Sequence, residues 1–227
     1  MTTAASPRPA VLFFDVNETL LDLAPLEASI RTVLPGPDSP DLWFSTMLHY
    51  SLVMTVAERK ALLPEIGVAA LRMLAEGRGI ALSQQAAEAA VRPITRLPAH
   101  PDVAPALARL RQAGLRMAAL SNSSTIGLRA QLAHAGIAHY FDAQFSVQDA
   151  GVYKPHPAVY QRAARQMRVG PGQAMLVAAH GWDVAGAAWA GLRTAFVCRP
   201  GKAPFPLAEP PELVVRDLDE LARRLEA

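Results

Sequence analysis

The chain has 227 residues, of which 51% are hydrophobic, and its 22 lysine and arginine residues nearly balance 20 acidic ones. The basic residues are scattered, so the net charge of +2 gives no electrostatic footprint for nucleic acid. Residues 1–9 lack the apolar core of a signal peptide, and no apolar run approaches the ~20 residues of a membrane span. We therefore expect a cytoplasmic protein that binds neither nucleic acid nor membrane.

The first predicted element is a strand at residues 11–14. Four apolar residues there run into Asp15, and such a run is typical of a strand buried on both faces of a parallel sheet. Asp15 would then stand at the carboxyl end of the strand, where open α/β sheets bind their ligands. A carboxylate there can act as a nucleophile, although an aspartate in such a place also commonly does no more than cap a turn.

The next segment, residues 22–97, replaces the strand pattern with apolar residues at helical spacing. Helices are predicted at residues 42–52 and 66–74 and from Ser83 onward. The proline-containing stretch at residues 97–101 marks the return to strands, because a residue before proline is disfavoured in a helix. We therefore expect a helical cap subdomain at 22–97.

After the cap, predicted helices and strands alternate, which favours βαβ units around a parallel sheet. The helices are expected at residues 103–113, 126–135, 158–167, 184–190 and from 218, and the strands near residues 115–120, 143–146, 175–179, 194–198 and 213–215. The predicted fold is α/β: a Rossmann-like, doubly wound core at 1–21 and 98–227 with the cap inserted. Cys198, the only cysteine, ends an apolar run, so we expect a buried and inert thiol.

Polar groups follow four of the predicted strands. Asp15 is followed by Ser121 and Asn122 after the second strand, by Lys154 in a Tyr-Lys-Pro sequence, and by Asp183 just beyond the 175–179 strand. Taken in this order over nearly the whole chain, these groups resemble the haloacid dehalogenase superfamily. Within it the chain is most similar to the type II enzymes, which hydrolyse L-2-haloacids such as 2-chloropropionate.

The resemblance implies roles for these residues and no cofactor. Asp15 would attack C2 of a small 2-haloacid and form an aspartyl ester that water then cleaves. Lys154 would hold Asp15 ionised, Thr19 would orient it, and Asp183 would orient Lys154 and help position the water. The implied substrate-binding residues are Asn17, Leu120, Ser121, Asn122, Phe44, His49, Tyr160, His180 and Trp182.

The chain departs from the superfamily at several positions. Phosphatases carry a second aspartate where Asn17 stands and an acidic residue where Ala179 stands, so both residues count against a Mg²⁺-dependent phosphatase. The dehalogenases carry a halide-binding cap arginine where Phe44 stands. Losing such a preorganised donor typically costs ~2.7–4 kcal/mol of transition-state stabilisation. His49 and His180 are the candidate replacements.

Other interpretations remain open from the residues alone. Lys154 could be a solvated lysine and Tyr160 a core tyrosine. The alternative functions are a phosphatase or phosphonate hydrolase with weak Mg²⁺ binding, and a catalytically weak scaffold that binds a small acid. The apolar helix faces of the cap also permit a homodimer.

Overall fold

The computed structural model describes residues 8–226, and its centre is a six-stranded parallel sheet with the strand order β3-β2-β1-β4-β5-β6. The strands are β1 (Val11–Phe14), β2 (Met117–Ser121), β3 (Ala143–Ser146), β4 (Ala174–Ala178), β5 (Arg193–Val197) and β6 (Leu213–Val215). Every residue of β1, β2 and β4 is buried, as expected for strands covered on both faces. The predicted α/β fold is confirmed.

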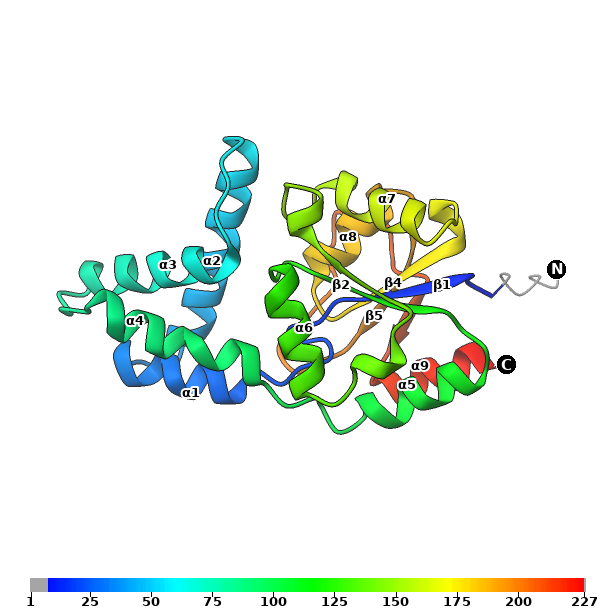
Figure 1. Cartoon of the computed structure of the whole chain (residues 1–227), viewed down its shortest axis with the longest axis horizontal. Helices are drawn as coiled ribbons and strands as arrows, with labels where there is room; N and C mark the ends of the chain where they lie inside the picture. Colours follow the sequence, from blue (N-terminus) through cyan, green and yellow to red (C-terminus); the bar gives the residue numbers. More distant parts are fainter. Residues whose placement is uncertain (1–7, 227) are drawn as a thin grey trace.

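Two layers of helices enclose this sheet. The helices are α5 (Val103–Gln112), α6 (Thr125–His134), α7 (Pro157–Gln166), α8 (Gly181–Trp189) and α9 (Leu218–Glu226). Figure 1 shows α7 and α8 on one side of the sheet and α5, α6 and α9 on the other. The register aligns Phe14 of β1 with Ala119 of β2 and Val177 of β4, so the carboxyl ends of the three central strands lie at one edge. Functional groups that follow these strands are thereby gathered in one place.

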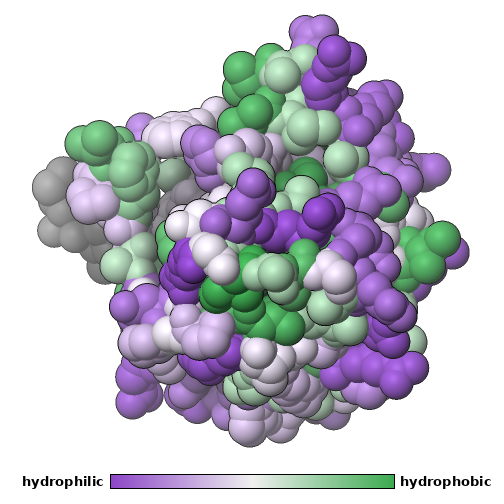
Figure 2. All heavy atoms as spheres, turned by 90° about the vertical axis from the view of Figure 1, so that its left-hand side faces the viewer, coloured by the Kyte–Doolittle hydropathy of each residue, from purple (hydrophilic) through white to green (hydrophobic). Residues whose placement is uncertain are grey.

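The remaining helices form a separate layer beside the sheet, seen on the left of Figure 1. They are α1 (Ala24–Val33), α2 (Ser39–Val56), α3 (Leu63–Gly77) and α4 (Gln84–Val91), followed by a 3₁₀ turn at Arg92–Arg96. The buried Trp43 ties α2 to α3, because its indole N–H donates to the carbonyl oxygen of Gly67 at 2.8 Å. Figure 2 shows hydrophobic patches among hydrophilic residues on the face that these helices present.

The two ends of this helical insertion meet at the sheet. The amide nitrogen of Asp22 donates to the carbonyl oxygen of Pro98 at 2.9 Å, and Leu21 forms an antiparallel bridge with Ala99. The chain therefore leaves the core and returns to it at one point.

Two expectations need correction. Helix α8 begins at Gly181, earlier than the predicted residue 184, because the chain turns into the helix almost directly after β4. Cys198 is exposed rather than buried, because β5 ends at Val197. The signal-peptide prediction concerned residues 1–9, of which residues 1–7 lie outside the described residues. None of the described helices combines the length and the apolar character needed to cross a membrane.

Candidate active site

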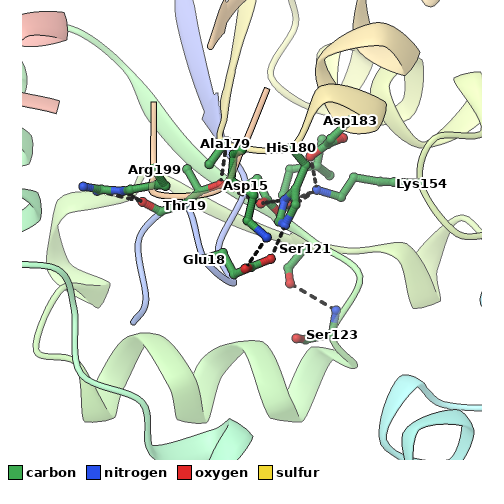
Figure 3. A network of polar contacts seen from close by, with 12 residues as sticks. Asp15, Glu18, Thr19, Ser121, Ser123, Lys154, Ala179, His180, Asp183 and Arg199 are labelled. Carbon is green, nitrogen blue, oxygen red and sulfur yellow. Dashed lines mark hydrogen bonds and ion pairs between the residues drawn. The ribbon is translucent and has the colours of Figure 1, made fainter. Parts of the chain in front are cut away.

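Asp15 lies at the carboxyl end of β1 and is only 5% exposed. Its Oδ1 accepts a hydrogen bond from Lys154 Nζ at 2.8 Å. Its Oδ2 accepts one from Thr19 Oγ1 at 2.7 Å and faces His180 Nδ1 at 3.0 Å (Figure 3). Burial raises the pKa of Asp15, but Lys154 and His180 outweigh this and hold its pKa well below the usual range. The carboxylate is therefore ionised and fixed in orientation.

Lys154 uses all of its side-chain donors inside the protein. Besides Asp15, its ammonium donates to Asp183 Oδ2 at 2.6 Å and to the carbonyl oxygen of Leu120 at 3.0 Å. Burial lowers the pKa of Lys154, but the two aspartates reverse this effect and raise it. Asn122 positions the same residue, because its Oδ1 accepts from the Lys154 amide nitrogen at 3.0 Å. The predicted contact of Lys154 with both aspartates is thus present in the structure.

Asp183 is completely buried at the start of α8. Lys154 occupies its Oδ2, and the Tyr160 hydroxyl donates to its Oδ1 at 2.5 Å. Burial raises the pKa of Asp183, and Lys154 opposes that rise. Burial together with Asp183 also raises the pKa of Tyr160 well above its ordinary value, so Tyr160 stays a neutral donor. Asp183 therefore orients Lys154 and has no direct bond to Asp15.

His180 bridges Asp15 and a second acid, Glu18. Its Nε2 lies 2.6 Å from Glu18 Oε2, and Lys202 Nζ lies 2.5 Å from Glu18 Oε1. Burial lowers the pKa of His180, but hydrogen bonds to Asp15 and Glu18 outweigh it and raise the pKa to about 9. At neutral pH the ring is an imidazolium, and both of its nitrogens donate to carboxylates.

Two aromatic rings flank the His180 imidazole. Phe44, which reaches over from α2, stacks at a centroid distance of 6.0 Å with 16° between the planes. Trp182 stacks at 5.2 Å and 29°. Aromatic faces attract a cation, so both rings favour the charged imidazole. The residue at the expected arginine position thus contacts the site through this histidine.

The other predicted residues lie around this centre. Ser121 Oγ accepts from the Ser123 amide nitrogen at 3.1 Å, while Asn122 Nδ2 is buried and has no hydrogen-bond partner. Asn17 Oδ1 accepts from Gln131 Nε2 at 2.9 Å and therefore faces α6. His49, in contact with Tyr50, lines a cavity of about 290 Å³ that Lys154 and Trp182 also border.

Sequence reasoning missed four residues of this site. Glu18 contacts His180, and Lys202 contacts Glu18. Gln131 donates a hydrogen bond to Asn17. Arg199 donates from Nη2 to the Thr19 carbonyl oxygen at 2.9 Å. Glu18 follows Asp15 in the same turn and is the one member that a search for nearby acids would find. Arg199 and Lys202 belong to the loop after β5 and Gln131 to α6, so all three are far from Asp15 in sequence.

The donor set does not fit a magnesium centre. The Lys154 ammonium lies between the carboxylates of Asp15 and Asp183 and bonds to both. Ala179 offers no side-chain ligand, and the Asn17 amide has no acidic proton to deliver. Across residues 8–226, no three His, Cys, Asp or Glu side chains are grouped to hold a metal ion. These features disfavour a Mg²⁺-dependent phosphatase.

Comparison with known proteins places this geometry in a family. A model of haloacid dehalogenase-like hydrolases matches residues 9–191. The (S)-2-haloacid dehalogenase H-109 of Pseudomonas putida is 29% identical, covering 93% of this chain and 95% of that protein. The (S)-2-haloacid dehalogenase 4A of Burkholderia cepacia is 30% identical, covering 92% and 91%.

Solved structures agree with this assignment. The L-2-haloacid dehalogenase of Xanthobacter autotrophicus superposes with a TM-score of 0.89 at 27% identity, covering 96% of this chain and 99% of that one. The same enzyme with chloropropionic acid covalently bound gives a TM-score of 0.87 at 27% identity, with the same coverage. The chain therefore belongs to the haloacid dehalogenase-like hydrolases.

Proposed function

We propose that this hydrolase removes halide from small (S)-2-haloalkanoic acids, using Asp15 as the nucleophile. The observation that carries the proposal is the ionised Asp15 carboxylate at the end of β1, which Lys154, Thr19 and His180 hold in place. Two residues later the chain has Asn17 rather than an acidic residue. Such a site has a nucleophile but lacks the aspartate two residues later that phosphatases of the superfamily use as a general acid. The names of the similar proteins support the same reaction.

In the first step Asp15 Oδ1 would attack C2 of the substrate. A new C–O bond forms as the carbon–halogen bond breaks, and the halide leaves with the bonding electron pair. Oδ1 is the better placed oxygen, because it has one donor, Lys154, whereas Oδ2 faces both Thr19 and His180. The product of this step is an ester between Asp15 and the substrate.

The substrate carboxylate would bind beyond β2. Asn122 Nδ2 is a buried donor without a partner, and Asn122 borders a cavity of about 280 Å³ next to Ser123 and Ser124. Those serines precede α6, whose amino-terminal N–H groups favour an anion. Ser121 and the neighbouring Leu120 complete this part of the proposed binding site.

The halide would leave into the cavity that His49 lines. His180 is a poor halide donor, because both of its ring nitrogens are engaged with Asp15 and Glu18. His49 on α2 borders the cavity next to Lys154 and Trp182, and it makes no hydrogen bond to either. We therefore prefer His49 to His180 as the replacement for the arginine that Phe44 displaces.

The helical insertion at 22–97 would act as the cap over this site. Tyr153 links it to the core, since its hydroxyl donates to the Ala61 carbonyl oxygen at 2.6 Å and its amide nitrogen donates to Thr55 Oγ1 at 3.1 Å. A cytoplasmic location and a homodimer through the cap belong to the same proposal. Exposed Leu52 and Val56 on α2 support such an interface.

The test is halide release from (S)-2-chloropropionate and bromoacetate in the presence of EDTA, with an Asp15→Asn variant as the blank. Release that survives chelation and disappears in the variant is the expected result. No release from either substrate contradicts the proposal. Mg²⁺-dependent hydrolysis of phosphate esters would then assign the chain to the phosphatases.

A further inference from the structure

We propose that His180, positioned by Glu18, is the general base that activates water for hydrolysis of the Asp15 ester. This inference rests on the proposed function and assigns its second step. The main structural support is that His180 Nδ1 lies 3.0 Å from Asp15 Oδ2. In the ester formed at Oδ1, Oδ2 becomes the carbonyl oxygen, so Nδ1 lies beside the carbon that water must attack.

Glu18 determines which ring nitrogen can accept the proton. Its Oε2 lies 2.6 Å from His180 Nε2, so a neutral ring keeps its proton on Nε2 and leaves the lone pair on Nδ1. Lys202 fixes Glu18 in turn through Oε1. A carboxylate that orients a histidine in this way stabilises the imidazolium formed when the base accepts a proton.

The change of charge at Asp15 explains how His180 becomes a base. In the resting site the His180 imidazolium lies between the carboxylates of Asp15 and Glu18. Lys154 pairs with Asp15 and also with Asp183, and Lys202 pairs with Glu18. Ester formation neutralises Asp15 and removes one of the two carboxylates. The Nδ1 proton of His180 then no longer faces a negatively charged acceptor, and it leaves to solvent. The overall hydrolysis requires this step, because each turnover releases one proton together with one halide ion.

The proton balance then closes. Neutral His180 takes a proton from water as the water oxygen bonds to the ester carbon. Collapse of the tetrahedral intermediate breaks the bond between that carbon and Oδ1, and the proton on His180 passes to the leaving alkoxide to give the 2-hydroxy acid. The Asp15 carboxyl group finally transfers its proton to His180, which restores the ion pair of the resting site.

Asp183 is less suited to this task. Its carboxylate is completely buried, Lys154 and Tyr160 donate to its two oxygens at 2.6 and 2.5 Å, and it has no hydrogen bond to Asp15. Accepting a proton would also break its pairing with Lys154, which itself holds Asp15. The structure therefore assigns Asp183 to positioning and His180 to proton transfer.

Rapid-quench measurement of chloride from (S)-2-chloropropionate, combined with intact-mass analysis, tests the proposal. His180→Asn keeps a side-chain donor near Oδ2 but provides no base. We expect it to release one equivalent of chloride per enzyme, to accumulate the Asp15 ester, and to turn over about 10²–10⁴-fold more slowly than the unmodified enzyme. Glu18→Gln should show the same initial chloride release with a smaller loss of steady-state turnover.

The possible outcomes distinguish failure of the His180 proposal from failure of the proposed dehalogenase function. His134→Asn, an exposed change on α6, serves as the matched control, and circular dichroism and thermal unfolding establish that each variant is folded. If folded His180→Asn turns over as fast as the control, or loses the initial chloride release itself, His180 is not the base for ester hydrolysis. If the unmodified enzyme releases no chloride, the proposed function fails and this inference falls with it.

Discussion

Phe44 lies nearly parallel to the His180 imidazole, with ring centroids 6.0 Å apart and 16° between the planes. Phe44 belongs to α2 of the helical insertion and His180 precedes α8 of the core, so the insertion contacts the active site directly. The ring covers a histidine that already donates to Asp15 and Glu18. An apolar group is therefore favoured where the related dehalogenases are expected to have a cation.

Replacing Phe44 by the expected family residue should reduce activity rather than improve it. In Phe44→Arg the guanidinium would lie beside the His180 imidazolium, and two like charges ~6 Å apart repel by about 2–3 kcal/mol at an effective dielectric constant of ~20. We expect steady-state halide release to fall by about tenfold or more, and Phe44→Leu, which keeps an apolar cover, to lose less. Faster release by Phe44→Arg would contradict this account of the site.

Removing the Lys154 ammonium should destabilise the fold as well as abolish activity. Lys154→Met leaves Asp15 and Asp183 buried without their shared cation, and breaking such a pair typically costs about 3–5 kcal/mol. Urea unfolding at neutral pH measures this loss. Lys202→Met is the matched control, because its partly exposed pair with Glu18 is worth about 0–1 kcal/mol. Equal stability of the two variants would argue against the buried triad.

The His180 imidazolium should make stability depend on pH in a defined range. Its pKa rises from 6.5 to about 9 on folding, so the folded state binds this proton more tightly than the unfolded chain. The resulting stabilisation, roughly 3 kcal/mol, is complete below pH ~6.5 and is lost as the pH rises towards ~9. Urea unfolding across this range should show a decline that His180→Gln lacks. Parallel curves for the two proteins would rule out this titration.

Gly186 allows α8 to approach the segment that carries Lys154. A Cβ atom at Gly186 would lie 2.3 Å from Pro155 Cβ and 3.0 Å from the Tyr160 hydroxyl. Gly186→Ala should therefore destabilise the protein by about 1–3 kcal/mol and slow halide release by displacing Lys154. Gly77→Ala, where a Cβ meets no heavy atom within 4 Å, should instead be neutral or stabilising by up to ~1 kcal/mol in thermal unfolding.

The sequence was sufficient to predict the six strands, though not their last residues, and the polar groups that follow them. Short apolar runs mark β1, β2 and β4 without ambiguity, and the shared edge of a parallel sheet then brings Asp15, Ser121 and Asp183 together. The contacts of Lys154 with Asp15 and Asp183 were expected from the family resemblance, because Lys154 lies well beyond the end of β3.

The contact between Glu18 and His180 was beyond such reasoning. It joins residues 162 positions apart, and Glu18 adopts a φ of 60°, a left-handed conformation that a glutamate rarely takes. The exposure of Cys198 was missed for a related reason, since an apolar run does not reveal where strand pairing stops. Both features are decided by tertiary packing rather than by local pattern.

The bridge between Leu21 and Ala99, with the Asp22 to Pro98 hydrogen bond beside it, has a consequence for how this architecture can diversify. The residues where the chain leaves the core and where it returns are bonded to each other, whatever segment lies between them. A longer, shorter or differently folded insertion that starts and ends at this bridge would leave the turn that carries Asp15 unchanged. The helix that carries Phe44 and His49 can therefore vary over evolution without rebuilding the turn that holds Asp15.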